Sequence, residues 1–212
     1  MTLVRTVYLE AADRAAGMIA DPAVADHWED PSALPEMTVG ALAGHLARQI
    51  FNVQRILAQP AADEPPISLL EHYARAAWID AGLQDPANTS IRDESAQEAA
   101  EGPAGLAARA AAAAGELREQ LAAEPDGRVV LIPWGPWPLT LDDMLRTRIM
   151  EIAVHGDDLA CSIGLDEAHL PAAVTDIAIG VLARLAVRRH GATAVLRALS
   201  RAERAPASIT GI

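Results

Sequence analysis

The amino-acid sequence predicts an all-α protein, and three observations support this fold class. Aromatic residues make up only 3% of the 212 residues, and β-branched residues seldom fall in alternating runs. Alanine, leucine, arginine and glutamate dominate, and these residues are strong helix formers. Several stretches repeat apolar residues at helical spacing, and one long connection separates two of them. This pattern is typical of a helical bundle with a crossover.

The first half of the chain contains two long predicted helices and a short one, each with start or stop signals. The first spans about residues 2–20 and ends at Asp21-Pro22, because proline cannot continue a helix. Thr38 can cap a second helix that reaches about residue 58. A capping box at Ser68-Leu69-Leu70-Glu71 opens a short helix to about Gly82.

The stretch from residue 59 to 101 is the long connection between two bundle helices. It is the least regular part of the sequence, and Asp85-Pro86-Ala87-Asn88 predicts a turn within it. Long connections in compact domains are often functional. We therefore expect this region, together with residues 128–138, to form much of any binding pocket.

The second half predicts two further bundle helices and a last helix. Residues 103–123 are nearly all helix formers, and residues 128–138 predict an extended or hairpin-like connection. Thr140 then opens a strong helix that reaches about residue 163. A last helix is predicted from about residue 171 to 190, and it begins with proline and ends before glycine.

Charge and cysteine content argue against several classes of protein. The net charge of −12 argues against nucleic acid or an anionic membrane surface as a partner. No stretch of 18 apolar residues predicts a membrane-spanning helix, and charged residues interrupt the first twenty positions, unlike a secretory signal peptide. The single cysteine, Cys161, allows no internal disulfide and is expected to be a small buried residue. A cytoplasmic location is therefore expected.

Residues near the end of the strong helix over 141–163 form the pattern with the clearest chemistry. Glu151 and His155 lie four residues apart on one helical face, with Asp158 one turn later and Arg148 one turn earlier. A third ligand from another helix would complete a divalent-metal site, and His45 on the apolar stripe of the second helix is the candidate. Two histidines and one carboxylate leave a position open, as in catalytic zinc sites.

The same residues allow simpler interpretations, which the pattern alone leaves open. His45 can be a core histidine with satisfied hydrogen bonds, and Glu151 with His155 can be a surface pair. Asp158 can orient a ligand rather than bind metal. Arg148 can meet a substrate carboxylate, but an internal pair with Glu151 or Asp158 is the more ordinary arrangement. Two other histidines, at positions 27 and 72, are expected to face solvent or a loop.

Two segments carry a resemblance to a known family. The first comprises Trp28, the run Pro31-Ser32-Ala33-Leu34-Pro35-Glu36-Met37-Thr38-Val39, Leu42 and His45-Leu46. The second is the run from Arg148 to Leu159, followed by Gly164. Together they resemble the mycothiol-dependent maleylpyruvate isomerase-like proteins of the DinB-like superfamily, over about residues 2–165.

The resemblance implies a DinB-like four-helix bundle with a long crossover between the second and third helices and an extra C-terminal helix. It implies metal ligands at His45, Glu151 and His155. We expect the bundle to occupy residues 1–191 and a short tail to occupy residues 192–212. The isomerases of the family carry a sizeable C-terminal domain, whereas here one helix and the tail follow Gly164.

The function expected from the resemblance is that of a metal-dependent thiol S-transferase or isomerase. Its thiol would be mycothiol or a similar small thiol, and its substrate a small electrophile. Zinc is favoured, with nickel or iron(II) as alternatives. Asp158 and Arg148 are the expected catalytic residues, and Trp134 and Trp137 are expected to wall the pocket that binds the thiol.

Two other functions remain open at this point. One is a non-catalytic bundle that binds metal or a partner, and the other is a metal-dependent hydrolase. The alanine-rich helices also permit a homodimer.

Overall fold

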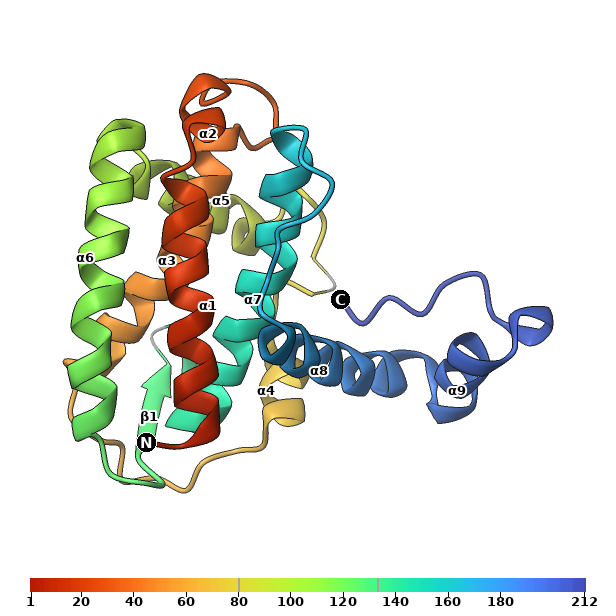
Figure 1. The fold of residues 1–212 in the computed structure, drawn as a ribbon. Helices are drawn as coiled ribbons and strands as arrows, with labels where there is room; N and C mark the ends of the chain where they lie inside the picture. The colour runs from red at the N-terminus through yellow and green to blue at the C-terminus, as the bar shows by residue number, and fades with distance from the viewer. Residues whose placement is uncertain (80, 133) are drawn as a thin grey trace.

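Four long helices form a bundle in the computed structural model, which describes residues 1–79, 81–132 and 134–212 (Figure 1). They are α1 (Leu3–Ile19), α3 (Val39–Leu57), α6 (Gly102–Ala123) and α7 (Leu141–Ser162). Helices α6 and α7 each pack against both α1 and α3. The all-α class and the bundle predicted from the sequence are confirmed.

The crossover between α3 and α6 contains two shorter helices, α4 (Leu69–Arg75) and α5 (Pro86–Glu98). Helix α4 is shorter than expected, because the backbone becomes extended at Ala76. Helix α5 was not predicted. The expected turn at Asp85-Pro86 is instead its start, with proline in the first turn, where its missing N–H costs no hydrogen bond. Helix α5 packs along α3.

A two-stranded antiparallel hairpin joins α6 to α7. Its strands are β1 (Val129–Ile132) and β2 (Gly135–Thr140), and their register shifts between Leu131 and Ile132. The extended connection predicted over residues 128–138 is therefore confirmed for the described residues, whereas Pro133 lies outside them. Thr140 caps α7 as expected, because its hydroxyl accepts a hydrogen bond from the Asp143 backbone N–H.

The chain leaves the bundle after α8 (Ala172–His190), which packs on α7 and α1, and its last residues return to it (Figure 1). Helix α8 confirms the last predicted helix, and α9 (Ala192–Ser200) and a 3-10 turn, η1 (Ala202–Arg204), project away from the bundle (Figure 1). The final residues turn back, so that Ile212 packs against an apolar cluster that includes Leu185 of α8 and Met150 of α7. The division into a domain over 1–191 and a tail over 192–212 stays a prediction.

A short helix, α2 (Pro22–Asp26), follows α1.

None of the helices in the described part of the chain combines the length and apolar character needed to cross a bilayer.

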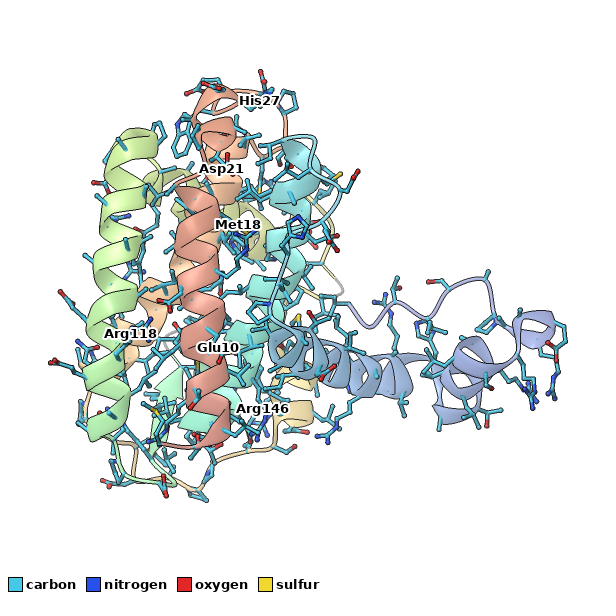
Figure 2. The ribbon with its side chains drawn as sticks, in the orientation of Figure 1. Glu10, Met18, Asp21, His27, Arg118 and Arg146 are labelled. Carbon is cyan, nitrogen blue, oxygen red and sulfur yellow. The ribbon has the colours of Figure 1, made fainter. Side chains whose placement is uncertain are left out.

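Arg5 ties three bundle helices together at the base of the molecule. Its side chain is only 1% exposed, and its Nε donates to Asp142 of α7 at 3.2 Å. The guanidinium also donates to three backbone carbonyls at and beyond the end of α6, those of Leu121, Glu124 and Pro125. These carbonyls have no partner within the helix ladder, so Arg5 satisfies them. In contrast, Arg118 of α6 forms an exposed ion pair with Asp13 (Figure 2).

The close approach of α5 to α3 requires a glycine at position 44. A Cβ on Gly44 would lie 2.2 Å from the Ser95 backbone oxygen. We therefore expect Gly44→Ala to lower the free energy of unfolding by about 1–3 kcal/mol, the usual cost of overpacking. Urea denaturation measures this change. The matched control is Gly115→Ala in α6, where no atom lies within 4 Å of the added Cβ. Because alanine favours helices, that variant is expected to gain about 0.5–1 kcal/mol, and an equal effect of both changes would contradict the prediction.

Candidate metal centre

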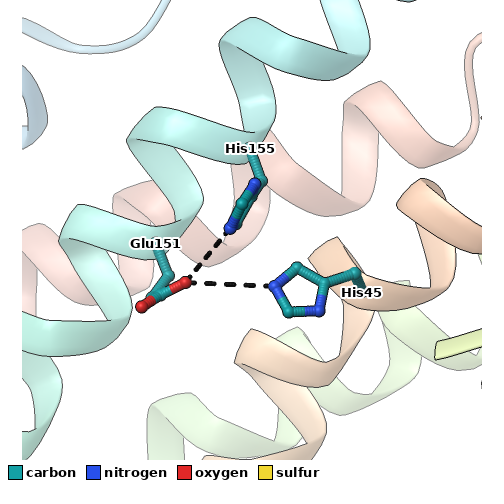
Figure 3. A group of neighbouring side chains, drawn as sticks. All are labelled: His45, Glu151 and His155. Carbon is teal, nitrogen blue, oxygen red and sulfur yellow. Dashed lines mark ion pairs between the residues drawn. The ribbon is translucent and has the colours of Figure 1, made fainter. Parts of the chain in front are cut away.

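The packing of α3 against α7 brings His45, Glu151 and His155 together (Figure 3). One nitrogen or oxygen atom from each side chain lies within 4.8 Å of the other two. Glu151 Oε2 is 3.2 Å from His155 Nε2 and 3.9 Å from His45 Nε2. The three side chains are only 12–17% exposed, so they do not form an ordinary surface pair.

Neighbouring residues orient both imidazole rings toward this point. The Ser95 hydroxyl of α5 donates to the Ile91 carbonyl at 2.6 Å, so its oxygen can accept from His45 Nδ1–H at 3.1 Å. The Asp158 carboxylate accepts from His155 Nδ1–H at 2.9 Å. Both Nε2 atoms therefore face Glu151. Hydrogen bonds of this type fix the tautomer and orientation of metal-binding histidines in proteins.

The charges of the cluster shift the pKa values of its members in opposite directions. Burial, followed by the charge of His155, lowers the pKa of His45 to about 4. Burial alone would lower the pKa of His155, but its contacts with Asp158 and Glu151 outweigh burial and raise the pKa to about 9. For Glu151, burial would raise the pKa, but contacts with both histidines and the charge of Arg148 hold it well below its ordinary value. Without metal, His155 thus carries a proton on Nε2 that a cation would replace.

The donor set fits a divalent cation. Two imidazole nitrogens and one carboxylate oxygen match the three-ligand sets of catalytic zinc sites, and they also suit nickel or iron(II). The hydrogen bonds from Ser95 and Asp158 supply the outer contacts that such ligands need. Asp158 is thus placed to orient His155, the role that the sequence suggested for it.

A cavity of about 990 Å³ opens onto the three candidate ligands. Arg148, Trp134 and Trp137, the other residues singled out from the sequence, line the same cavity. Trp134 is 43% exposed, and the Arg148 guanidinium carbon lies 5.0 Å from the centre of its ring. Six of the seven predicted site residues therefore border this cavity. The seventh, Asp158, does not line it but is hydrogen-bonded to His155, which does.

The internal ion pair considered for Arg148 is absent. Its Nη1 donates to Gln49 Oε1 at 2.6 Å and its Nε donates to Thr147 Oγ1 at 3.0 Å. No acidic oxygen of the described residues lies within 4.0 Å of the guanidinium, although the side chain is only 7% exposed. The physical reason is that Glu151 and Asp158 turn toward the imidazoles instead.

Two expectations outside the predicted site were wrong. His72 is buried rather than exposed, because α4 packs onto α7 and the hairpin. Cys161 is exposed rather than buried, because it lies on the outer face of α7. His27 is exposed, as expected. The sequence did not identify Ser95 as a partner of His45, because Ser95 lies on α5, a helix that was not predicted.

The opposite pKa shifts predict how the stability of metal-free protein depends on pH. The raised pKa of His155 adds stability that is fully present below the ordinary value of 6.5 and is lost as pH rises through about 9. The lowered pKa of His45 removes stability as pH falls from 6.5 toward 4. We therefore expect these two histidines to give a maximum near pH 6.5 in urea denaturation after chelation. His155→Gln should flatten the alkaline side, and an unchanged alkaline slope would contradict the assignment.

Comparison with known proteins gives two further findings. A family model described as the mycothiol maleylpyruvate isomerase N-terminal domain matches residues 8–160. Two uncharacterized proteins of Mycobacterium tuberculosis, from strains CDC 1551 / Oshkosh and ATCC 25618 / H37Rv, are each 33% identical to 141 residues, or 66%, of this chain. The match covers 49% of each, so the chain spans about half the length of these curated relatives. No solved structure matches the chain.

Proposed function

We propose that this chain, which belongs to the mycothiol maleylpyruvate isomerase N-terminal domain family, is a metal-dependent enzyme that joins a small thiol to an electrophilic substrate or isomerises that substrate. The thiol would be mycothiol or a related compound, and zinc is the favoured metal. In conjugation, sulfur bonds to an electrophilic carbon while an alkene π bond or an epoxide C–O bond breaks, and the thiol proton ends on the neighbouring carbon or oxygen. In isomerisation of an alkene, sulfur adds and the π bond breaks, the adduct rotates about the resulting single bond, and the double bond re-forms as the thiol is expelled.

The observation that supports this proposal best is the convergence of two oriented imidazoles and a carboxylate on the wall of one large cavity. A purely structural metal site is usually closed by four protein ligands, whereas a catalytic site keeps a position for a substrate or water. The described residues supply three candidate ligands, and the cavity lies beside them.

Each part of the site has a role in the proposal. His45, Glu151 and His155 would hold the cation. When bound, the cation would favour the thiolate form of the thiol near neutral pH. Ser95 and Asp158 hold the two rings in place through their hydrogen bonds. Trp134 and Trp137 wall the space in which the thiol and the electrophile would meet.

The experiment has two parts, metal content and turnover. Protein purified without chelator is analysed for zinc, nickel and iron, and mycothiol consumption is then followed with an activated alkene and with an epoxide. We expect near-stoichiometric metal and thiol loss that stops after chelation and returns with added zinc. Metal uptake without turnover would instead favour a binding protein, and product formed without thiol would favour a hydrolase.

A further inference from the structure

His72 is a buried histidine on the cavity wall that the proposed chemistry does not use. It lies on α4, its side chain is 4% exposed, and it borders the same cavity as the candidate metal ligands. Trp137 Nε1–H donates to His72 Nδ1 at 3.0 Å. An indole nitrogen can only donate a hydrogen bond, so Nδ1 must carry a lone pair. The ring is therefore neutral, and its one N–H is on Nε2.

The Nε2–H group of His72 is open to the cavity. It has no hydrogen-bond partner among the described residues. Two side-chain atoms of the described chain are both fully buried and without a hydrogen bond, Tyr73 Oη and Arg128 Nε. His72 Nε2 is not one of them, so this unpartnered atom keeps some exposure to solvent. An unpartnered N–H on a residue that lines a cavity is suited to bind an oxygen atom of a ligand.

Arg148 supplies a positive charge beside this donor. His72 of α4 and Arg148 of α7 line the same cavity, and the two helices pack against each other. Burial and then the charge of Arg148 lower the pKa of His72 to about 4, whereas the charge of Glu151 opposes this shift. Four other arginines line the cavity, but each of them pairs with a glutamate: Arg48, Arg55, Arg75 and Arg92. Arg148 differs from these four arginines because it has no carboxylate partner among the described residues. Its Nε and Nη1 each donate a hydrogen bond, whereas its Nη2 donates to no described residue.

We propose that His72 and Arg148 form a subsite for a carboxylate group of a substrate. Arg148 provides the charge, and His72 provides a neutral donor whose direction Trp137 fixes. The subsite deepens the proposed function and depends on it for the identity of the substrate. Hydrogen bonds to a charged group are stronger than those to a neutral one, so the subsite would favour an acid over its amide by about tenfold or more.

The first experiment uses the full chain after chelation, with no metal and no thiol present. Imidazole nitrogens are observed by long-range proton–nitrogen NMR, and the protein is titrated with crotonate and with its amide, crotonamide. We expect the His72 proton on Nε2, a shift of that signal with crotonate, and at least about tenfold weaker binding of crotonamide. A proton on Nδ1, or equal binding of acid and amide, would overturn the proposal.

Matched variants separate the donor from the packing of the ring. His72→Gln keeps an N–H near the position of Nε2. In His72→Asn the shorter side chain keeps an acceptor for Trp137 near the position of Nδ1, but its N–H groups do not reach the position of Nε2. We expect His72→Asn and Arg148→Gln each to weaken crotonate binding about tenfold or more, and His72→Gln to stay within about threefold. Wild-type affinity in His72→Asn would overturn the proposal. Trp137→Phe is a second test, which does not depend on whether a His72 variant folds. It removes the N–H that fixes the tautomer of His72, so we expect it to weaken crotonate binding.

These measurements remain independent of whether the chain is a thiol-dependent enzyme, because they need neither metal nor turnover. In the metal-loaded protein with mycothiol, the co-substrate whose KM rises in His72→Asn would be the one that brings the carboxylate. An equal fall in kcat/KM for both co-substrates would contradict the subsite.

Discussion

His155→Ala is expected to reduce bound metal to background and to stop metal-dependent thiol consumption. The change removes one of three ligands and also leaves Asp158 without its imidazole partner. Loss of an outer contact alone commonly costs about 10–100-fold in metal affinity, so loss of a ligand should cost at least about 100-fold. Elemental analysis and a zinc competition assay measure the effect.

Two variants serve as controls for His155→Ala. His27→Ala removes an exposed histidine beyond the C-terminal end of α1, which is not one of the candidate ligands, and should keep full metal content and activity (Figure 2). Asp158→Asn keeps all three candidate ligands but weakens the orientation of His155, so an intermediate loss of about 10–100-fold is expected. If His155→Ala retained stoichiometric metal at wild-type affinity while folded, the proposed centre would be wrong.

Arg5→Ala is expected to cause the largest loss of stability, about 3 kcal/mol or more in the free energy of unfolding. Arg5 is buried and donates to the partly exposed Asp142 and to three backbone carbonyls, and each buried group left without its partner costs about 1–3 kcal/mol. The variant would remove the donor of Asp142 and of the Leu121 and Glu124 carbonyls, whereas the Pro125 carbonyl would keep its hydrogen bond from the Arg128 backbone N–H. Urea denaturation of metal-saturated protein measures this loss. The same experiment on Arg118→Ala, which breaks an exposed ion pair between α1 and α6, should show a change of about 0–1 kcal/mol.

The comparison of the two arginines tests burial rather than charge, because each variant removes one guanidinium near the same pair of helices. A similar small loss in both would mean that water replaces the contacts of Arg5, and that the base of the bundle does not depend on this side chain. A large loss in Arg5→Ala alone would establish it as the tie between α1, α6 and α7.

The long helices were predictable because their signals are local. Apolar residues at helical spacing and capping residues such as Thr38 and Thr140 depend only on neighbours within one or two turns. Helix α5 has no comparable apolar stripe, and Ser95 is its single buried residue. Its position is determined by packing against α3, including the close contact at Gly44, which no local pattern reveals.

The candidate site likewise contains residues that local sequence patterns predict and residues that they do not. Glu151 and His155 could be found from their spacing on one helix, and His45 from its unusual place on an apolar stripe together with the family resemblance. Ser95 and His72 could not be found in this way, because both lie in the crossover. Ser95 contacts His45 from α5, and His72 lines the cavity from α4. Arg148 shows the limit clearly, since its spacing suggested a pair with Glu151 or Asp158, but both carboxylates bind imidazoles instead.

The returning end of the chain has a practical consequence for any engineered fusion. Ile212 is only partly exposed, packs against α8 and borders the cavity. An affinity tag or fluorescent reporter attached there would begin at the cavity entrance and crowd incoming ligands. Met1 is 58% exposed at the base of the bundle, so a label placed ahead of it would leave the entrance clear (Figure 1).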